Sequence, residues 1–252
     1  MKISKRTCVT LQKSLLNWIL PAQCILCSSK IPTNNATIHQ TLVHRNSLCV
    51  FCVDSLPKIF NACSLCNTPL SSGKLCGVCI NSQRHWDRCF AAFEYKDPIK
   101  QLITEFKYHK KPALGQPLGS LLYEHIINNH DKKMPDYLIP VPMHHNQLKH
   151  RGFNQSLALC KRLSSALNIP VINIIKKTTI TQNQKGLSSA ERKKSIKNSF
   201  QINNKALKQL ENIKAVAIID DVMTTGSTTS EIARILKKSG ISTIYIWVLA
   251  RT

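Results

Sequence analysis

The sequence predicts an α/β fold, a mostly parallel sheet with helices on both faces, preceded by a small cysteine-rich module. From Phe90 onward, apolar strand-like runs alternate with helical repeats, which is typical of a parallel sheet. Upstream of Phe90, eight cysteines form four pairs of one spacing. At 252 residues, the chain is long enough for one good core and a small additional module.

The order of these patterns predicts three segments. We expect an N-terminal amphipathic helix at residues 1–21, the cysteine-rich module at 22–86 and the α/β domain at 87–252.

Within the α/β domain, each element is predicted from its own pattern. A strand is expected at residues 90–95, and a helix begins at Pro98 because apolar residues repeat from Ile99 to Phe106 at helical spacing. The remaining elements are a helix at 118–128, a strand at 136–142, a helix at 154–167 capped near Asn154, a strand at 171–175, a strand at 215–220, a helix at 228–239 that stops at Gly240, and a strand at 243–250.

The charge of the chain is strongly unbalanced. It carries 35 Lys and Arg against 13 Asp and Glu, a formal net charge of +22. This excess favours a polyanionic partner or substrate, such as nucleic acid or phosphates. A generally basic proteome, or solubility, is the alternative interpretation.

No apolar run approaches the roughly 18 residues that a membrane span needs, so we do not expect an integral membrane protein. The first 24 residues superficially resemble a signal peptide. However, Gln12, Lys13 and Asn17 interrupt the apolar part, and no small-residue cleavage site follows. We therefore predict a cytoplasmic location.

The cysteine pairs predict two structural zinc sites. A two-residue gap lets a tight turn direct two thiolates at one tetrahedral ion, and two such pairs complete a site. Thiols stay reduced in the cytosol, so disulfides are not expected. We expect the pairs to combine in sequential order, although the spacing also fits an interleaved arrangement. The predicted ligands are Cys24, Cys27, Cys49, Cys52, Cys63, Cys66, Cys76 and Cys79. The module would serve as a structural cap or as a docking surface for nucleic acid or protein.

The stretch "VAIIDDVMTTGSTT", residues 216–229, predicts a ligand site. A buried strand ends on Asp220 and Asp221, and a loop of small residues then leads into a helix. Backbone N–H groups at a helix N-terminus form a natural phosphate cradle, and Gly226 permits close approach. The acid pair would bind the hydroxyls of a ribose, and the loop would bind its 5′-phosphate. A simple helix cap is the alternative, but it leaves the acid pair unexplained.

Residues 216–228 resemble the phosphoribosyl pyrophosphate (PRPP) signature of type I phosphoribosyltransferases. The resemblance implies the fold of those enzymes for the α/β domain and PRPP, or a related sugar phosphate, as ligand. It also implies that Asp220 and Asp221 bind the ribose diol. The residues implied around the 5′-phosphate are Thr224, Thr225, Gly226, Ser227 and Thr228.

Three further stretches resemble the ComF/GntX family. They are "FKYHKK" at 106–111, "PVPMHHNQLKHRGFNQS" at 140–156 and "TQNQKGLSSAER" at 181–192, all downstream of the cysteine pairs. That family joins a double zinc ribbon to a phosphoribosyltransferase domain. It is associated with natural competence, with the handling of incoming single-stranded DNA and with the use of DNA as a nutrient. The resemblance also implies the DNA-uptake machinery as a partner.

Further site residues follow from this resemblance. Lys149 and Arg151, in the turn at 140–151, are candidate cations for the diphosphate, although charges in loops are common. Mg²⁺ would bridge diphosphate and diol. Asp220, Asp221 and Arg192 are the catalytic candidates, with Arg192 stabilising the departing charge from a closing loop at 178–198. Ser195 departs from the family pattern, which commonly has Asn there.

Two functions remain open at this point. The first is a ComF-like protein that binds PRPP and handles single-stranded DNA. The second is an active PRPP-dependent transferase on a base or amine, unrelated to DNA. Single-strand binding needs a basic groove with aromatic stacking platforms. The candidate residues are Lys107, Tyr108, Lys110 and Lys111.

Overall fold

The computed structural model describes residues 23–31, 47–109, 111–130, 133–178, 199–203 and 213–252. The chain divides into two compact units, residues 1–56 and 57–252. The predicted N-terminal helix at 1–21 lies outside the described residues. The predicted boundary between residues 86 and 87 stays a prediction. In the smaller unit, helix α3 spans Val50–Asp54.

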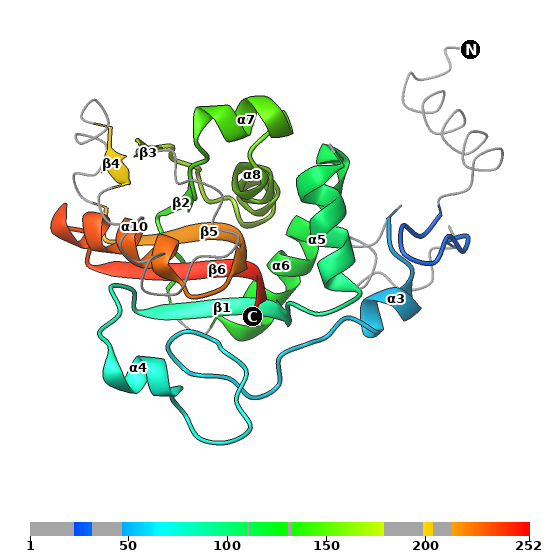
Figure 1. The fold of residues 1–252 in the computed structure, drawn as a ribbon, viewed down its shortest axis with the longest axis horizontal. Coiled ribbons are helices and arrows are strands. Elements are labelled where there is room, and N and C mark those ends of the chain that lie inside the picture. The colour runs from blue at the N-terminus through cyan, green and yellow to red at the C-terminus, as the bar shows by residue number, and fades with distance from the viewer. Residues whose placement is uncertain (1–22, 32–46, 110, 131–132, 179–198, 204–212) are drawn as a thin grey trace, which may run out of the picture. The chain divides into compact units, whose positions relative to one another are not determined.

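A four-stranded parallel sheet forms the centre of the larger unit (Figure 1). The strand order is β1-β6-β5-β2, and each neighbouring pair is parallel. The strands are β1 at Arg88–Glu94, β2 at Tyr137–Pro140, β5 at Ala215–Met223 and β6 at Thr243–Arg251. Strand β6 is buried along all but its first residue, as in a sheet that is covered on both faces. The predicted α/β fold is confirmed.

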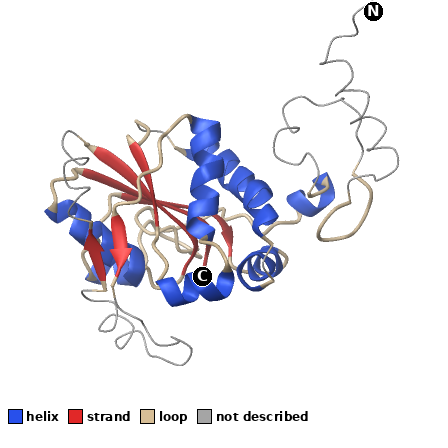
Figure 2. Ribbon diagram, turned by 90° about the horizontal axis from the view of Figure 1, so that it is seen from above, coloured by secondary structure: helices blue, strands red, loops and turns tan. Residues whose placement is uncertain are grey.

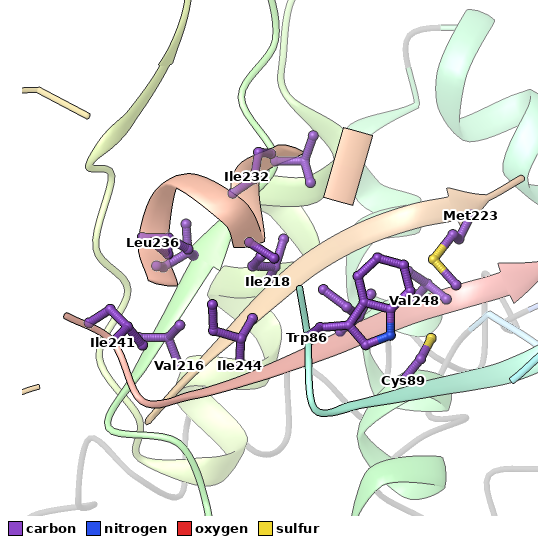
Figure 3. Packing of buried hydrophobic residues seen from close by; sticks show 14 of the residues in the cluster. Trp86, Cys89, Val216, Ile218, Met223, Ile232, Leu236, Ile241, Ile244 and Val248 are labelled. Atoms are coloured by element: carbon purple, nitrogen blue, oxygen red, sulfur yellow. The ribbon is translucent and has the colours of Figure 1, made fainter. Parts of the chain in front are cut away.

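Helices cover both faces of this sheet (Figure 2). Helices α6, at Gly115–Asn129, and α8, at Gln155–Leu167, pack against one face. Helix α10, at Ser227–Lys238, packs against the other. Figure 3 shows Ile232 and Leu236 of α10 directed at alternate residues of β5 and β6, among them Ile218.

The apolar repeat after Pro98 forms helix α5, at Ile99–Tyr108. Its predicted apolar residues, from Ile99 to Phe106, are all buried. Asn154 caps α8 as predicted, because its side-chain oxygen accepts a hydrogen bond from the amide of Leu157 at 3.3 Å. Short helices occur as η1, at Pro112–Leu114, and as α4, at Gly77–Asn81.

Two elements differ from the prediction. The strand expected at 171–175 is reduced to one bridge between Val171 and Leu138, after which the chain leaves the sheet. It then forms β3, at Ile175–Lys177, antiparallel to β4, at Phe200–Ile202.

The polar loop expected after β2 is instead helix α7, at His145–Arg151. The side chain of His144 caps its first turn by accepting a hydrogen bond from the amide of Asn146. Gly152, with φ 83°, ends the helix in the left-handed region that glycine tolerates.

None of the helices in the described part of the chain is long and apolar enough to cross a bilayer.

Helices α6 and α8 approach each other so closely at Gly119 that a larger side chain there should separate them. A methyl group at Gly119 would lie 2.7 Å from the Cβ atom of Arg162 in α8. We expect Gly119→Ala to push the two helices apart and to lower the free energy of unfolding by about 1–3 kcal/mol. Chemical denaturation measures this. Gly77→Ala is the control, because a methyl group there meets nothing within 4 Å. Equal losses in the two variants would contradict the prediction.

Candidate ligand-binding site and metal centres

The acid pair lies at the carboxyl end of the sheet, where β2 has already stopped. Strand β2 pairs with β5 only as far as Pro140 beside Ile219. Strand β5 continues beside β6 as far as Met223, so the strand does not stop at Asp220 as predicted. Asp220 and Asp221 therefore occupy a strand segment with a neighbour on one side only. Ligands of parallel sheets bind at this end of the strands.

The two carboxylates have different partners, because successive strand residues point in opposite directions. The ammonium group of Lys107, near the end of α5, lies 2.9 Å from Oδ1 of Asp221. Both side chains are largely buried, with 18% and 9% of their surface exposed. Asp220 accepts hydrogen bonds from the Ser156 hydroxyl, in the first turn of α8, and from the amide of Asp221, both at 2.9 Å.

Burial and the adjacent charge of Asp221 raise the pKa of Asp220 to about 7. Lys107 and the hydrogen bond from Ser156 limit that rise. Burial also works against the Lys107 ammonium, but Asp221 and Asp220 outweigh it and raise the Lys107 pKa above its ordinary value. The site thus holds one firmly paired carboxylate, and beside it a carboxyl that titrates near neutral pH.

The loop after β5 has the features predicted for a phosphate cradle. Gly226, with φ 74°, adopts a left-handed conformation immediately before α10. The Thr225 and Ser227 hydroxyls lie 2.7 Å apart, and the Ser227 amide donates to the Thr225 hydroxyl at 3.3 Å. Thr224 is exposed, and Thr228 is half-buried in the first turn of α10. The loop therefore offers hydroxyls and helix N–H groups to an anion.

The predicted cations lie on α7. The guanidinium of Arg151 lies 5.1 Å from the centre of the Tyr108 ring and donates to the Gln155 side chain at 3.3 Å. Lys149 is exposed on the same helix. The structure thus places Arg151 against Tyr108, the last residue of α5, which follows Lys107 in the sequence.

The residues predicted for nucleic-acid binding separate into different environments. Lys107 contacts the acid pair, so its ammonium group is not on the open surface. The Tyr108 side chain is 56% exposed. The Lys111 ammonium lies 2.5 Å from the carboxylate of Glu105. Lys110 lies outside the described residues.

The predicted closing loop connects β3 to β4. Residues 179–198 of that loop, Arg192 included, lie outside the described residues. Lys177, at the end of β3, is close enough to Asp220 for the two charges to interact. Burial lowers the Lys177 pKa, and Asp220 opposes this.

Sequence reasoning did not assign Ser156 or Lys107 to the acid pair. Both residues lie inside stretches that carry the family resemblance, at 140–156 and 106–111. Their place in those stretches was the available signal, but no local pattern indicates which strand they contact.

Two four-cysteine clusters form the candidate metal centres, and both combine the pairs in sequential order. One consists of Cys24, Cys27, Cys49 and Cys52, and the other of Cys63, Cys66, Cys76 and Cys79. Within each cluster, the sulfur atoms lie within 4.8 Å of one another.

The sulfur positions fit a tetrahedral metal ion. The Sγ atoms of Cys27 and Cys49 are 3.7 Å apart, and those of Cys66 and Cys76 are 3.6 Å apart. A metal–sulfur bond of about 2.3 Å places tetrahedral sulfurs about 3.8 Å apart. Hydrogen bonds from Ser29 lower the pKa of Cys27 to about 6, which favours the thiolate that a metal requires.

Known proteins with similar sequences align with most of the chain. No protein-family model matches. Competence protein F of Haemophilus influenzae is 35% identical over 215 residues, which cover 83% of this chain and 92% of that protein. DNA utilization protein YhgH of Shigella flexneri is 31% identical over 81% of this chain and 90% of that protein.

Among solved structures, the glutamine PRPP amidotransferase of B. subtilis aligns with a TM-score of 0.37 and 15% identity. The alignment covers 57% of this chain and 30% of that protein. A TM-score of this size does not bear on ligand or reaction.

The parallel sheet, covered by helices, and the two four-cysteine clusters define an α/β protein with two candidate metal centres. The 35% sequence identity to competence protein F, over 83% of this chain, identifies the family: the chain belongs to the ComF family.

The raised pKa of Asp220 makes the stability of the ligand-free protein depend on pH. The folded protein binds this proton more tightly than the unfolded chain, so the contribution of Asp220 to stability is most favourable below about pH 4 and is lost as pH rises to about 7. Asp220→Asn removes the charge and keeps the acceptor for Ser156. We expect the variant to gain about 1–3 kcal/mol at pH 8 and little at pH 4, measured by thermal unfolding.

Asp136→Asn is the matched control, with the opposite expected sign. Backbone amides of Ala215 and Lys214 donate to the Asp136 carboxylate and hold its pKa below the ordinary value. Its neutral variant should therefore lose stability at pH 8. An Asp220→Asn variant that is less stable than wild type at pH 8 would contradict the prediction.

Proposed function

We propose that the chain binds PRPP between β5 and the N-terminus of α10, and that it handles single-stranded DNA in natural competence. The acid pair carries this proposal. Two adjacent carboxylates, one with a pKa of about 7, weaken the ligand-free fold at neutral pH. Groups with such perturbed pKa values are concentrated at functional sites, where a ligand uses them.

In this proposal, the ribose hydroxyls of PRPP donate to Asp220 and Asp221, and the 5′-phosphate binds the loop at 224–228. The diphosphate lies toward Arg151 and Lys149. Lys107 already balances the charge of Asp221 at 2.9 Å. Mg²⁺ would therefore bind with the diphosphate and the diol, where it neutralises phosphate charge, rather than directly at Asp221.

The DNA part of the proposal centres on the end of α5. Tyr108 offers a ring that is more than half exposed, with the Arg151 guanidinium beside it. An aromatic ring and a cation together form a platform for an unpaired base, and the net charge of +22 supplies long-range attraction. Relatives are named as a competence protein and a DNA utilization protein. We propose the DNA-uptake machinery as partner on the same ground.

The arrangement also predicts communication between DNA and PRPP. Lys107 and Tyr108 are adjacent in the last turn of α5. Lys107 contacts the acid pair, and Tyr108 lies on the surface. A change at Asp221 on ligand binding would therefore alter the charge and position of the turn that presents Tyr108.

A second candidate function is an active PRPP-dependent transferase on a base or amine. The pKa of Asp220 favours it, because a carboxyl that titrates near 7 can accept a proton at neutral pH. The bond from C1 of the ribose to the diphosphate oxygen would break, the acceptor nitrogen would bond to C1, and its proton would pass to Asp220. Release of diphosphate that depends on an added base or amine would establish this function.

We propose that each four-cysteine cluster binds one structural zinc ion. All eight ligands are sulfur atoms, and their spacing suits a tetrahedral ion of this size. We propose a cytoplasmic location as well, because thiols that serve as metal ligands stay reduced there.

The PRPP and DNA proposal is tested with a labelled single-stranded oligonucleotide over a salt series, with and without Mg²⁺ and PRPP. We expect binding that weakens steeply with salt, and a PRPP effect that Asp220→Asn combined with Asp221→Asn abolishes. Tyr108→Ala should weaken binding by about five- to a hundredfold, because a stacking platform is lost. Tyr108→Phe keeps the ring and is the matched control.

Binding no stronger than that of an unrelated cationic protein, with no response to PRPP, would reject the DNA function. The transferase function would then be examined with bases and amines as acceptors.

The zinc proposal is tested by metal analysis of the purified protein. We expect two zinc ions per chain and about one in Cys79→Ser, which removes a ligand of the second cluster. Cys89→Ser is the matched control, because Cys89 is buried but belongs to neither cluster. Retention of both zinc ions by Cys79→Ser would show that this cluster does not bind one.

A further inference from the structure

Arg251, at the end of β6, is a buried cation. Only 6% of its surface is exposed. A buried guanidinium needs acceptors for its N–H groups and compensation for its charge. Besides the adjacent Thr252, whose main-chain oxygen lies 2.6 Å from Nη1 of Arg251, the acceptors come from two regions far apart in sequence, the end of β5 and the second cysteine cluster.

On one side, Arg251 holds the start of the candidate phosphate loop. Its Nη1 atom donates to the carbonyl oxygen of Met223 at 3.0 Å and to that of Thr224. Met223 is the last residue of β5, and Thr224 is the first residue of the loop. These bonds fix the direction in which the loop backbone leaves the sheet.

On the other side, Arg251 holds the second cluster. Its Nη2 atom donates to the Thr68 hydroxyl at 2.7 Å, and its Nε atom donates to the carbonyl oxygen of Cys66 at 3.3 Å. The Thr68 hydroxyl lies 3.1 Å from Sγ of Cys66. Because this hydroxyl accepts from Arg251, its own hydrogen is available to the sulfur. A hydrogen-bonded chain therefore runs from a metal-ligating sulfur to the loop.

Electrostatic attraction also connects the second cluster to Arg251. Four thiolates around a divalent ion keep a net negative charge. A metal-loaded second cluster would therefore help to offset the positive charge of the buried Arg251 guanidinium.

Two more residues connect the same cluster to the same loop. The Trp86 indole donates to the carbonyl oxygen of Leu65 at 2.9 Å, and a methyl group at Gly226 would lie 3.1 Å from the Trp86 ring. Figure 3 shows Trp86 close to Met223. Arg84 lies over the Trp86 ring and reaches the carbonyl oxygen of Thr225 at 3.5 Å.

We propose that Arg251 is a positioning residue, which transmits the order of the metal-loaded second cluster to the phosphate-binding loop at 224–228. The assignment of the loop to phosphate rests on the proposed function. The connection itself does not, because it concerns the order of the loop backbone.

The test compares Thr68→Val with Thr68→Ser in the full chain. Valine removes the hydroxyl at nearly constant volume, and serine keeps it. We expect Thr68→Val to bind ribose 5-phosphate about five- to tenfold more weakly and to exchange the amides of 224–228 about tenfold faster, because the donors of Arg251 lose an acceptor. Thr68→Ser should match wild type in both measurements. Zinc content is recorded for every variant.

Arg251→Met and Arg251→Lys form a second pair, which is informative wherever the variants fold. Methionine removes all the N–H donors of Arg251. Lysine keeps the positive charge but lacks the planar guanidinium, whose donors reach both the cluster and the loop. Both should accelerate exchange in the loop, and the methionine variant should do so more.

The outcomes separate the two proposals. Equal loop exchange in Thr68→Val and Thr68→Ser overturns the positioning role, whatever the zinc content. If wild type does not bind ribose 5-phosphate but Thr68→Val still loosens the loop, the phosphate function fails and the positioning role stands.

Discussion

The carboxylates of Asp220 and Asp221 repel each other, and their partly buried place leaves little water to screen that repulsion. The fold compensates from two helices, with the Lys107 ammonium of α5 on Asp221 and the Ser156 hydroxyl of α8 on Asp220. This requirement fixes where α5 ends and where α8 begins relative to β5. Tyr108 and Arg151 then come together beside the acid pair.

The second cysteine cluster belongs to the same compact unit as the sheet, and it packs against Met223, which leads into the candidate phosphate loop. Arg251, Trp86 and Arg84 all make this connection. A cysteine cluster that looks like an independent module in sequence is thus part of the support of the candidate ligand site in the α/β domain.

Local patterns predicted much of this molecule. The apolar repeat of α5 and the cap at Asn154 follow from neighbours within a few residues, and the cysteine clusters follow from pairs that are consecutive in the sequence. The partners of Lys107 and Arg251 could not be predicted in this way, because they join segments more than a hundred residues apart. Helix α7 was missed because Leu148 is its only apolar residue and no helical repeat can be recognised, and its ends depend on His144 and Gly152 instead.

The position of β6 has a consequence for the order of folding. It follows every other described strand in the sequence, yet it lies between β1 and β5 in the sheet. Strand β1 pairs along its length with β6, so Arg88 can pair with Tyr245 only after β6 has been added to the sheet. Early segments of a growing chain can form their helices, but the sheet closes only when β6 is inserted. The molecule therefore depends on contacts of high sequence separation, which are slow to form, and the candidate ligand site is completed in the same late step as the core.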